Sequence, residues 1–282
     1  MSHIEMINKA LEGYMPESED IVSRAMRYSV ENGGKRIRPE LVLSFCEACG
    51  GDAENALPLA CALEMIHTYS LIHDDLPCMD NDDLRRGKPT NHVVFGECTA
   101  TLAGDALQAE AFRTILSTSL PAEVRAECAR LLAEAAGENG ICGGQQLDME
   151  GEGKALTKEE LMDINDRKTS AMIYAACLMG VTCGGGNEQQ REAAAKYAKA
   201  LGLAFQIRDD MLDVISTESE LGKPIGSDAR EGKNTFMALY GLERCGAYVH
   251  ELSEQAAAAV DGAFADSAFL QQLARSLADR KN

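Results

Sequence analysis

Residues 56–80 read ALPLACALEMIHTYSLIHDDLPCMD and carry the pattern on which the expected fold depends. Leu59, Leu63 and Ile66 recur every three or four residues, which is the period of a helix with one buried face. His67 and Asp74 continue the same stripe. Because a buried charge is costly unless it is paired or bound to a metal, polar groups on an inward face indicate a site inside a helical protein.

The end of this helix carries further acidic residues. Asp75 follows Asp74 directly, and Asp80 comes after a Leu-Pro-Cys-Met spacer. On a continuous helix Asp80 would lie about 120° around the axis from Asp74. Pro77 is expected to end the helix, which would let Asp80 swing back toward Asp74.

A second helical segment begins at a capping box formed by Thr157 and Glu160 and continues to about Met179. Its apolar stripe contains one lysine, Lys168, with Thr169 beside it. Two interpretations stay open here. Either the lysine stem is buried while the amine reaches water, or the amine requires an anionic partner.

A third helix, from about residue 188 to 216, ends in a second acidic cluster. At about 100° per residue, Asp209, Asp210 and Asp213 project to one side of it. Carboxylates this close repel one another unless a cation lies between them, and oxygen ligands suit magnesium. A single cluster is usually a solvated surface, but two clusters on separate apolar helices favour a metal site.

Basic residues accompany both acidic clusters. Residues 33–39, GGKRIRP, concentrate three cations in one loop, and Arg85-Arg86 follows the first cluster. Lys223 and Lys233 follow the second. Since arginine and lysine bind phosphate oxygens, an acidic cluster followed by a basic one, twice, indicates a metal-bridged diphosphate clamp.

Composition agrees with a helical enzyme and excludes some classes of partner. Apolar residues make up 45% and aromatics 5%, with no Trp, and the net charge is -18. This charge disfavours nucleic acid and anionic membrane surfaces as partners. The ten cysteines show no disulfide framework, and no apolar run is long enough to span a membrane. A cytoplasmic protein is expected.

The periodicity is helical throughout, without an alternating strand pattern of useful length or a linker. The expected fold is therefore all-α, with residues 1–282 forming one helical domain.

These ordered motifs resemble those of the trans-isoprenyl diphosphate synthases. Residues 73–80 with 82–87 resemble the family's first aspartate-rich motif, and residues 205–213 resemble the second. Lys168-Thr169 and the loop 33–39 also match. The resemblance implies a helical bundle around a deep central cavity, usually a homodimer. It also implies head-to-tail condensation of isopentenyl diphosphate with dimethylallyl or geranyl diphosphate.

The resemblance further implies a role for each matching residue. The residues implied to bind three magnesium ions, for which manganese could substitute, are Asp74, Asp80 and Asp209. Those implied to orient ligands or waters around the ions are Asp75, Asp210 and Asp213. Those implied to hold the allylic diphosphate are Arg85, Lys168, Lys223 and Lys233. Those implied to hold isopentenyl diphosphate are Lys35, Arg38, His67 and Arg86. Thr169 and Gln206 would face the carbon on which positive charge develops.

Product length is expected to depend on Tyr69 and Ser70, which precede Asp74 on the helix. An aromatic at this position in the family blocks the growing chain, so Tyr69 favours the fifteen-carbon farnesyl product. It lies about 140° around the helix from Asp74 and must reach the cavity from the side. A core tyrosine that points away from the cavity, and a twenty-carbon geranylgeranyl product, remain the alternatives.

Two other functions share parts of this pattern. A terpene cyclase would carry more aromatics and an Asn/Ser/Glu metal motif in place of Asp209 to Asp213. A non-catalytic regulatory subunit would have lost motif members, and none is missing. One departure is that residues 232–237 read GKNTFM where the family often reads Gly-Lys-x-Thr-Tyr-Pro, so the lysine and the threonine are kept.

Overall fold

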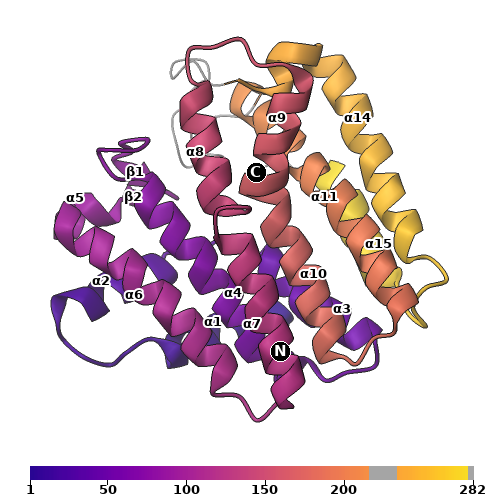
Figure 1. The fold of residues 1–282 in the computed structure, drawn as a ribbon, viewed down its shortest axis with the longest axis horizontal. Coiled ribbons are helices and arrows are strands. Elements are labelled where there is room, and N and C mark those ends of the chain that lie inside the picture. The colour runs from indigo at the N-terminus through magenta and orange to yellow at the C-terminus, as the bar shows by residue number, and fades with distance from the viewer. Residues whose placement is uncertain (216–233, 279–282) are drawn as a thin grey trace.

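The computed structural model describes residues 1–215 and 234–278, and their fold is helical (Figure 1). The first helices are α1 (His3–Tyr14), α2 (Ile21–Val30), α3 (Ile37–Ala48), α4 (Ala53–Asp74), α5 (Asn91–Phe95), α6 (Glu97–Leu116) and α7 (Ala122–Ala136). They are followed by α8 (Ile141–Gly151), α9 (Lys158–Asn165), α10 (Ala171–Cys183), α11 (Glu188–Ile215), α14 (Phe236–Val260) and α15 (Ala268–Ala278). The strands β1 (Leu84–Arg85) and β2 (Lys88–Pro89) pair antiparallel in a small hairpin. The predicted all-α class is confirmed.

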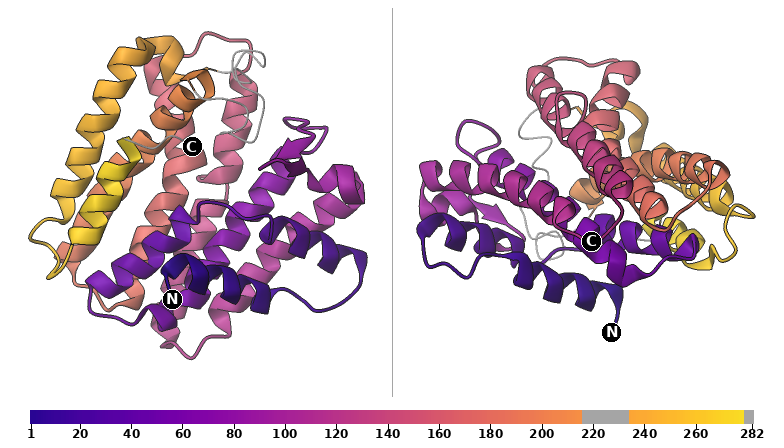
Figure 2. Two further views of the ribbon diagram at one scale, coloured as in Figure 1. Left: turned by 180° about the vertical axis from the view of Figure 1, so that it is seen from behind. Right: turned by 60° about the horizontal axis from the view of Figure 1, so that its bottom comes forward.

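Helix α4 runs through the centre of the bundle and is buried along most of its length. It packs against α1, α3, α6 and α10, which explains why its sequence is apolar on nearly every face. In the view from behind, α1 and α2 cross the near face while α11, α14 and α15 lie together at one side (Figure 2). The polar end of α4, at Asp74, is followed by the segment that carries the β1–β2 hairpin.

Helix ends follow the local sequence. Thr157 and Glu160 form the predicted capping box at the start of α9. Helix α10 ends at Cys183, where the glycine run 184–186 begins. Asp75 caps α4, so this helix stops before Pro77 as expected.

The predicted helix through Lys168 contains an irregular turn. Residues Asp166–Ser170 form the π-helical turn η1 between α9 and α10, closed by the Ala171 N–H bonding to the Asp166 carbonyl. Two glycines from neighbouring helices pack against it. A Cβ on Gly144 of α8 would lie 2.4 Å from the Lys168 backbone nitrogen, and one on Gly202 of α11 would lie 2.5 Å from Ser170 Oγ. Only glycine allows these helices to approach so closely.

All ten cysteines are free thiols, so no disulfide ties the helices together. Within residues 1–215 and 234–278, none of the helices has the length and apolar character needed to cross a lipid bilayer.

Candidate active site

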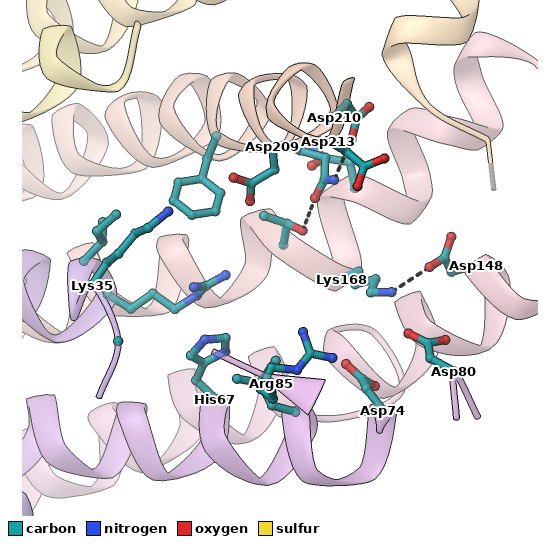
Figure 3. Close-up of a pocket in the computed structure, with 18 of the residues that line it drawn as sticks. Lys35, His67, Asp74, Asp80, Arg85, Asp148, Lys168, Asp209, Asp210 and Asp213 are labelled. Atoms are coloured by element: carbon teal, nitrogen blue, oxygen red, sulfur yellow. Dashed lines mark hydrogen bonds and ion pairs between the residues drawn. The ribbon is translucent and has the colours of Figure 1, made fainter. Parts of the chain in front are cut away.

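A cavity of about 590 Å³ lies among α4, α8, α11, η1 and the loop before α3 (Figure 3). Its carboxylates are those of Glu64, Asp74, Asp80, Asp82, Asp148, Asp209, Asp210 and Asp213. Its cations include Lys35, Arg38, Arg85, Arg86 and Lys168, and His67, Thr169 and Gln206 also line it. Among the described residues, the predicted metal, diphosphate and carbocation residues are thus brought to one place. Lys223 and Lys233 lie outside the described residues.

The two acidic clusters occupy opposite walls. Asp74 and Asp80 lie on the α4 side, whereas Asp209, Asp210 and Asp213 extend from α11 across the cavity (Figure 3). The backbone after α4 supports this arrangement, because the Asp80 N–H donates to the Asp74 carbonyl oxygen at 2.9 Å. The predicted return of Asp80 toward Asp74 is therefore observed.

Asp74 is a buried carboxyl group with both carboxylates and cations around it. Its pKa is raised to about 6, mainly by burial and also by the neighbouring Asp80 and Asp75, while Lys168 and Arg85 act to lower it. Across the described residues, no group of three His, Cys, Asp or Glu side chains could hold a metal ion by itself. Oxygen donors on two facing walls nevertheless fit magnesium, with remaining ligands from water or a bound anion.

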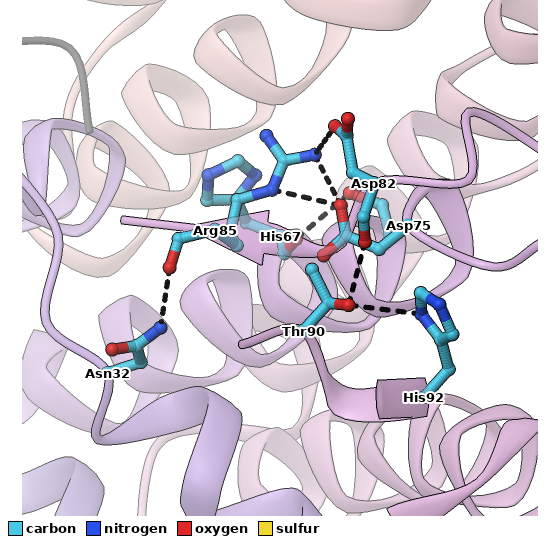
Figure 4. Close-up of polar contacts among 8 residues, drawn as sticks. Asn32, His67, Asp75, Asp82, Arg85, Thr90 and His92 are labelled. Carbon is cyan, nitrogen blue, oxygen red and sulfur yellow. Dashed lines mark hydrogen bonds and ion pairs between the residues drawn. The ribbon is translucent and has the colours of Figure 1, made fainter. Parts of the chain in front are cut away.

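Arg85 lies beside the first acidic cluster and is paired with it (Figure 4). Its Nε donates to Asp75 Oδ1 at 3.0 Å, and its Nη2 donates to the same oxygen and to Asp82 Oδ2. Two hydrogen bonds hold the hairpin that carries Arg85 in place. Thr90 Oγ1 donates to the Asp82 carbonyl, and the Asn32 side chain donates to the Arg85 carbonyl. Asp75 therefore positions a cation of the cavity.

The loop 33–39 divides its three predicted cations. Arg36 is 4% exposed and turns into the protein, where Nη1 lies 2.6 Å from Glu64 Oε1. Its φ of 52° is left-handed, so the backbone reverses there. The Arg36–Glu64 pair forms part of the cavity wall together with Lys35 and Arg38, and the Arg38 guanidinium carbon lies 5.5 Å from the centre of the Phe205 ring. Arg36 therefore has a structural role. Glu64, an acidic residue within the apolar helix α4, is the sequence feature that could have predicted this buried pair.

Lys168 has an anionic partner within the protein, as the second of the two sequence interpretations requires. Its Nζ lies 2.6 Å from Asp148 Oδ2 (Figure 3). Both side chains keep partial exposure to the cavity, 28% for Lys168 and 20% for Asp148. Sequence reasoning missed Asp148, which is one of two acidic residues, with Glu150, near the end of the glycine-containing helix α8.

Thr169 and Gln206 lie together as expected, and Asp210 extends the contact. Thr169 Oγ1 donates to Gln206 Oε1 at 2.8 Å, and Gln206 Nε2 donates to Asp210 Oδ1 at 2.9 Å. The other oxygen of Asp210 accepts the Phe236 N–H at 2.7 Å, at the start of α14. Three segments of the chain therefore meet in this network.

His67 lies on the α4 wall among arginines. Burial lowers its pKa well below the usual range, and the charges of Arg38, Arg86, Arg85 and Arg36 lower it further. The imidazole is therefore neutral, and an anion bound beside it would raise its pKa.

Tyr69 and Ser70 do not line this cavity, which is bordered on α4 by Glu64, His67, Leu71 and Asp74. Tyr69 is 2% exposed, and its hydroxyl donates to the Ala136 carbonyl at 3.3 Å, at the end of α7. The expectation that the ring reaches the cavity is therefore not met, because it lies too far around α4 from Asp74.

The polyprenyl synthetase family matches residues 19–273 of the chain. Farnesyl diphosphate synthase of Geobacillus stearothermophilus is 51% identical over 84% of this chain and 82% of its own length. The chain belongs to the polyprenyl synthetase family. Plant relatives match as well: the heterodimeric geranylgeranyl pyrophosphate synthase large subunit 1 of Arabidopsis thaliana is 45% identical over 99% of this chain and 77% of its own.

Solved structures of polyprenyl synthetases show the same fold. A geranyltransferase of Helicobacter pylori, crystallised with magnesium and isoprenyl diphosphate, has a TM-score of 0.88 at 33% identity, covering 98% of this chain and 94% of its own. A Zymomonas mobilis FPP/GFPP synthase without ligand has a TM-score of 0.84 at 38% identity and the same coverage. The predicted family and fold are confirmed.

Proposed function

We propose that this protein is a prenyltransferase that condenses isopentenyl diphosphate with dimethylallyl or geranyl diphosphate, forming farnesyl diphosphate and releasing diphosphate. The observation that carries the proposal is the cavity itself, in which two acidic walls face each other with cations on both sides. Bacterial farnesyl diphosphate synthases at about 50% identity support the same activity.

The proposed cofactor is magnesium, as three ions, with manganese as a substitute. Asp74 and Asp80 would hold it from one wall and Asp209 from the other. When bound, the ions neutralise the diphosphate and make it a better leaving group. The raised pKa of Asp74 supports this role, because burial disfavours the ionised carboxyl group and a bound cation would stabilise it.

The proposed diphosphate contacts come from cations in two regions. Lys35, Arg38, His67 and Arg86 would hold isopentenyl diphosphate near the α3 and α4 walls. The proposed residues for the allylic diphosphate are Arg85, Lys168, Lys223 and Lys233, of which the first two line the cavity. Both sets are needed, because a chain of net charge -18 repels a diphosphate at long range.

The proposed stabilisation of the allylic cation comes from oxygen dipoles. Thr169 and Gln206 line the cavity and would present oxygens to the carbon as diphosphate leaves. The double bond of isopentenyl diphosphate then attacks that carbon. The departing diphosphate takes the final proton.

The fifteen-carbon product is proposed on the strength of the bacterial relatives, with the twenty-carbon product of the plant relatives as the alternative. Any effect of Tyr69 on product length would be indirect, because the ring lies outside the cavity. It would act through the contacts of its hydroxyl with the α7–α8 junction. Ser70 donates to the His67 carbonyl and would act through the position of His67. The product ratio of Tyr69→Ala with excess isopentenyl diphosphate tests the tyrosine.

We further propose one catalytic domain spanning residues 1–282 that works in the cytoplasm as a homodimer. Size-exclusion chromatography with light scattering tests the dimer.

The activity test incubates pure protein and magnesium with isopentenyl diphosphate and each primer, then identifies the alcohols after phosphatase treatment. Farnesol as the main alcohol, with stoichiometric diphosphate, is expected. Geranylgeraniol would correct the product length. Cyclic alcohols or hydrocarbons would indicate a terpene cyclase, and no diphosphate release would indicate a regulatory subunit.

A further inference from the structure

A chain of hydrogen bonds links the cavity to the start of α14 through Asp210. Thr169, at 7% exposure, donates to Gln206 at 2.8 Å, and Gln206 donates to Asp210 at 2.9 Å. Asp210, 4% exposed, accepts the Phe236 N–H at 2.7 Å through its second oxygen. Each carboxylate oxygen thus receives a hydrogen bond from a different segment.

The direction of this chain follows from the chemistry of its members. An ionised carboxylate accepts hydrogen bonds and a backbone N–H donates them. The group of Gln206 that faces Asp210 must therefore be its NH₂, so its carbonyl oxygen faces Thr169. Because that oxygen can only accept a hydrogen bond, the Thr169 hydroxyl must donate its hydrogen bond to Gln206.

We propose that Asp210 is a positioning residue that sets the polarity of Thr169 through Gln206. Because the Thr169 hydroxyl donates to Gln206, its oxygen lone pairs can face the cavity. In the proposed reaction, positive charge develops there on the allylic carbon. This inference rests on the proposed prenyl transfer. It gives Asp210 a task in carbocation stabilisation, separate from the orientation of metal ligands implied by the family resemblance.

The reversed chain shows what Asp210 prevents. In Asp210→Asn, the asparagine oxygen can accept the Phe236 N–H, which leaves its NH₂ facing Gln206. The Gln206 amide would then turn over and present its own NH₂ to Thr169. Thr169 would have to accept, and its hydroxyl proton would point at the carbon that becomes positive. We expect kcat to fall by about 100-fold, as when one stabilising dipole of an active site is lost.

The decisive experiment exchanges the two side chains. In Gln206→Glu with Asp210→Asn, the introduced asparagine can donate to the carboxylate at position 206 and still accept from Phe236. The new carboxylate also accepts a hydrogen bond from the Thr169 hydroxyl. The direction of this hydrogen bond and the net charge are then both the same as in the wild type. The kcat of the exchange variant should be about tenfold or more above that of Asp210→Asn. The Gln206→Glu variant alone sets two carboxylates against each other and should be impaired.

Three readouts separate this role from a metal or folding role. The KM values and the half-activating magnesium concentration of Asp210→Asn should stay within about threefold of the wild type, while kcat falls. In a Thr169→Val background, adding Asp210→Asn should lower kcat only slightly further, because there is no hydroxyl left to orient. Circular dichroism and thermal melting establish that each variant is folded. If Asp210→Asn does not fold, the exchange variant is compared with Gln206→Glu, and activity above that variant supports the proposal.

The proposal is overturned if the exchange variant is no better than Asp210→Asn. It is also overturned if high magnesium restores the Asp210→Asn turnover, since Asp210 would then act through the metal. A wild type that releases no diphosphate would instead refute the proposed function itself.

Discussion

At the scale of single residues, two cations of the cavity form ion pairs with nearby carboxylates. Lys168 contacts Asp148, and Arg85 contacts Asp75 and Asp82. Each pair holds a cation at the cavity wall, where the proposed diphosphate would compete with a carboxylate. Single substitutions should therefore separate ligand binding from stability.

Asp74→Asn and Asp209→Asn should each lower kcat by orders of magnitude, because each removes the charge of one proposed metal ligand. Activity should require magnesium or manganese and disappear in chelator. Steady-state kinetics at several metal concentrations provide the measurement, with circular dichroism to show an intact fold. Near-normal turnover of both variants would contradict the proposed metal site.

Lys168→Ala should weaken allylic binding far more than binding of isopentenyl diphosphate. Its pair with Asp148 is partly exposed, so the free energy of unfolding should fall by no more than about 1 kcal/mol. The matched control is Arg167→Ala on the same turn, whose guanidinium pairs with Asp163. Equal loss of allylic affinity in both variants would show that Lys168 has no special role.

His67 should make stability depend on pH. Its folded pKa lies well below the usual 6.5, so the unfolded chain binds the extra proton first and the fold loses stability as pH falls below 6.5. Between pH 6.5 and 5.5 this amounts to about 1 kcal/mol. Urea unfolding of His67→Gln should show a correspondingly smaller loss than wild type. The exposed His250→Gln is the control and should keep the wild-type slope.

At the scale of elements, the π turn η1 determines where Lys168 and Thr169 lie. It inserts a wider turn between α9 and α10, and it is enclosed by Gly144 on one side and Gly202 on the other. Asn165 adds a bond to Ser170 at 3.2 Å. The active-site side chains of this helix therefore depend on the contacts of η1 with its neighbours.

Gly144→Ala should displace η1, because its Cβ would lie 2.4 Å from a backbone nitrogen that cannot move independently. We expect a loss of about 1–3 kcal/mol in stability together with reduced kcat. Gly13→Ala in α1 is the matched control, since no atom lies within 4 Å of its Cβ, and it should be neutral or stabilising. Thermal melts and kinetics would contradict the prediction if both variants behaved alike.

At the scale of the whole molecule, the Arg36–Glu64 pair joins the loop before α3 to the centre of α4. Arg36 also donates to Asn8 and to the Val30 carbonyl, so four segments meet at one guanidinium. Lys35 and Arg38 are placed in the cavity by this buried anchor.

Arg36→Met should lower the free energy of unfolding by about 3–5 kcal/mol, because it leaves the Glu64 charge buried without its partner. Arg36→Met with Glu64→Leu should recover much of this loss. The exposed pair of Arg130 and Glu134 is the control, and Arg130→Met should cost about 1 kcal/mol or less. Urea unfolding provides the measurement, and equal costs at both pairs would contradict the expected burial effect.

The sequence by itself determined the helices, the all-α class and the residues that gather in the cavity. These follow from local periodicity, caps and spacing, which act within a few turns of one helix. Tertiary structure decided which groups pair. Arg36 turns inward to Glu64, Lys168 meets Asp148, and Tyr69 points to the α7–α8 junction. Those choices join residues 20 or more positions apart, so they depend on how helices pack and on which charges burial forces together.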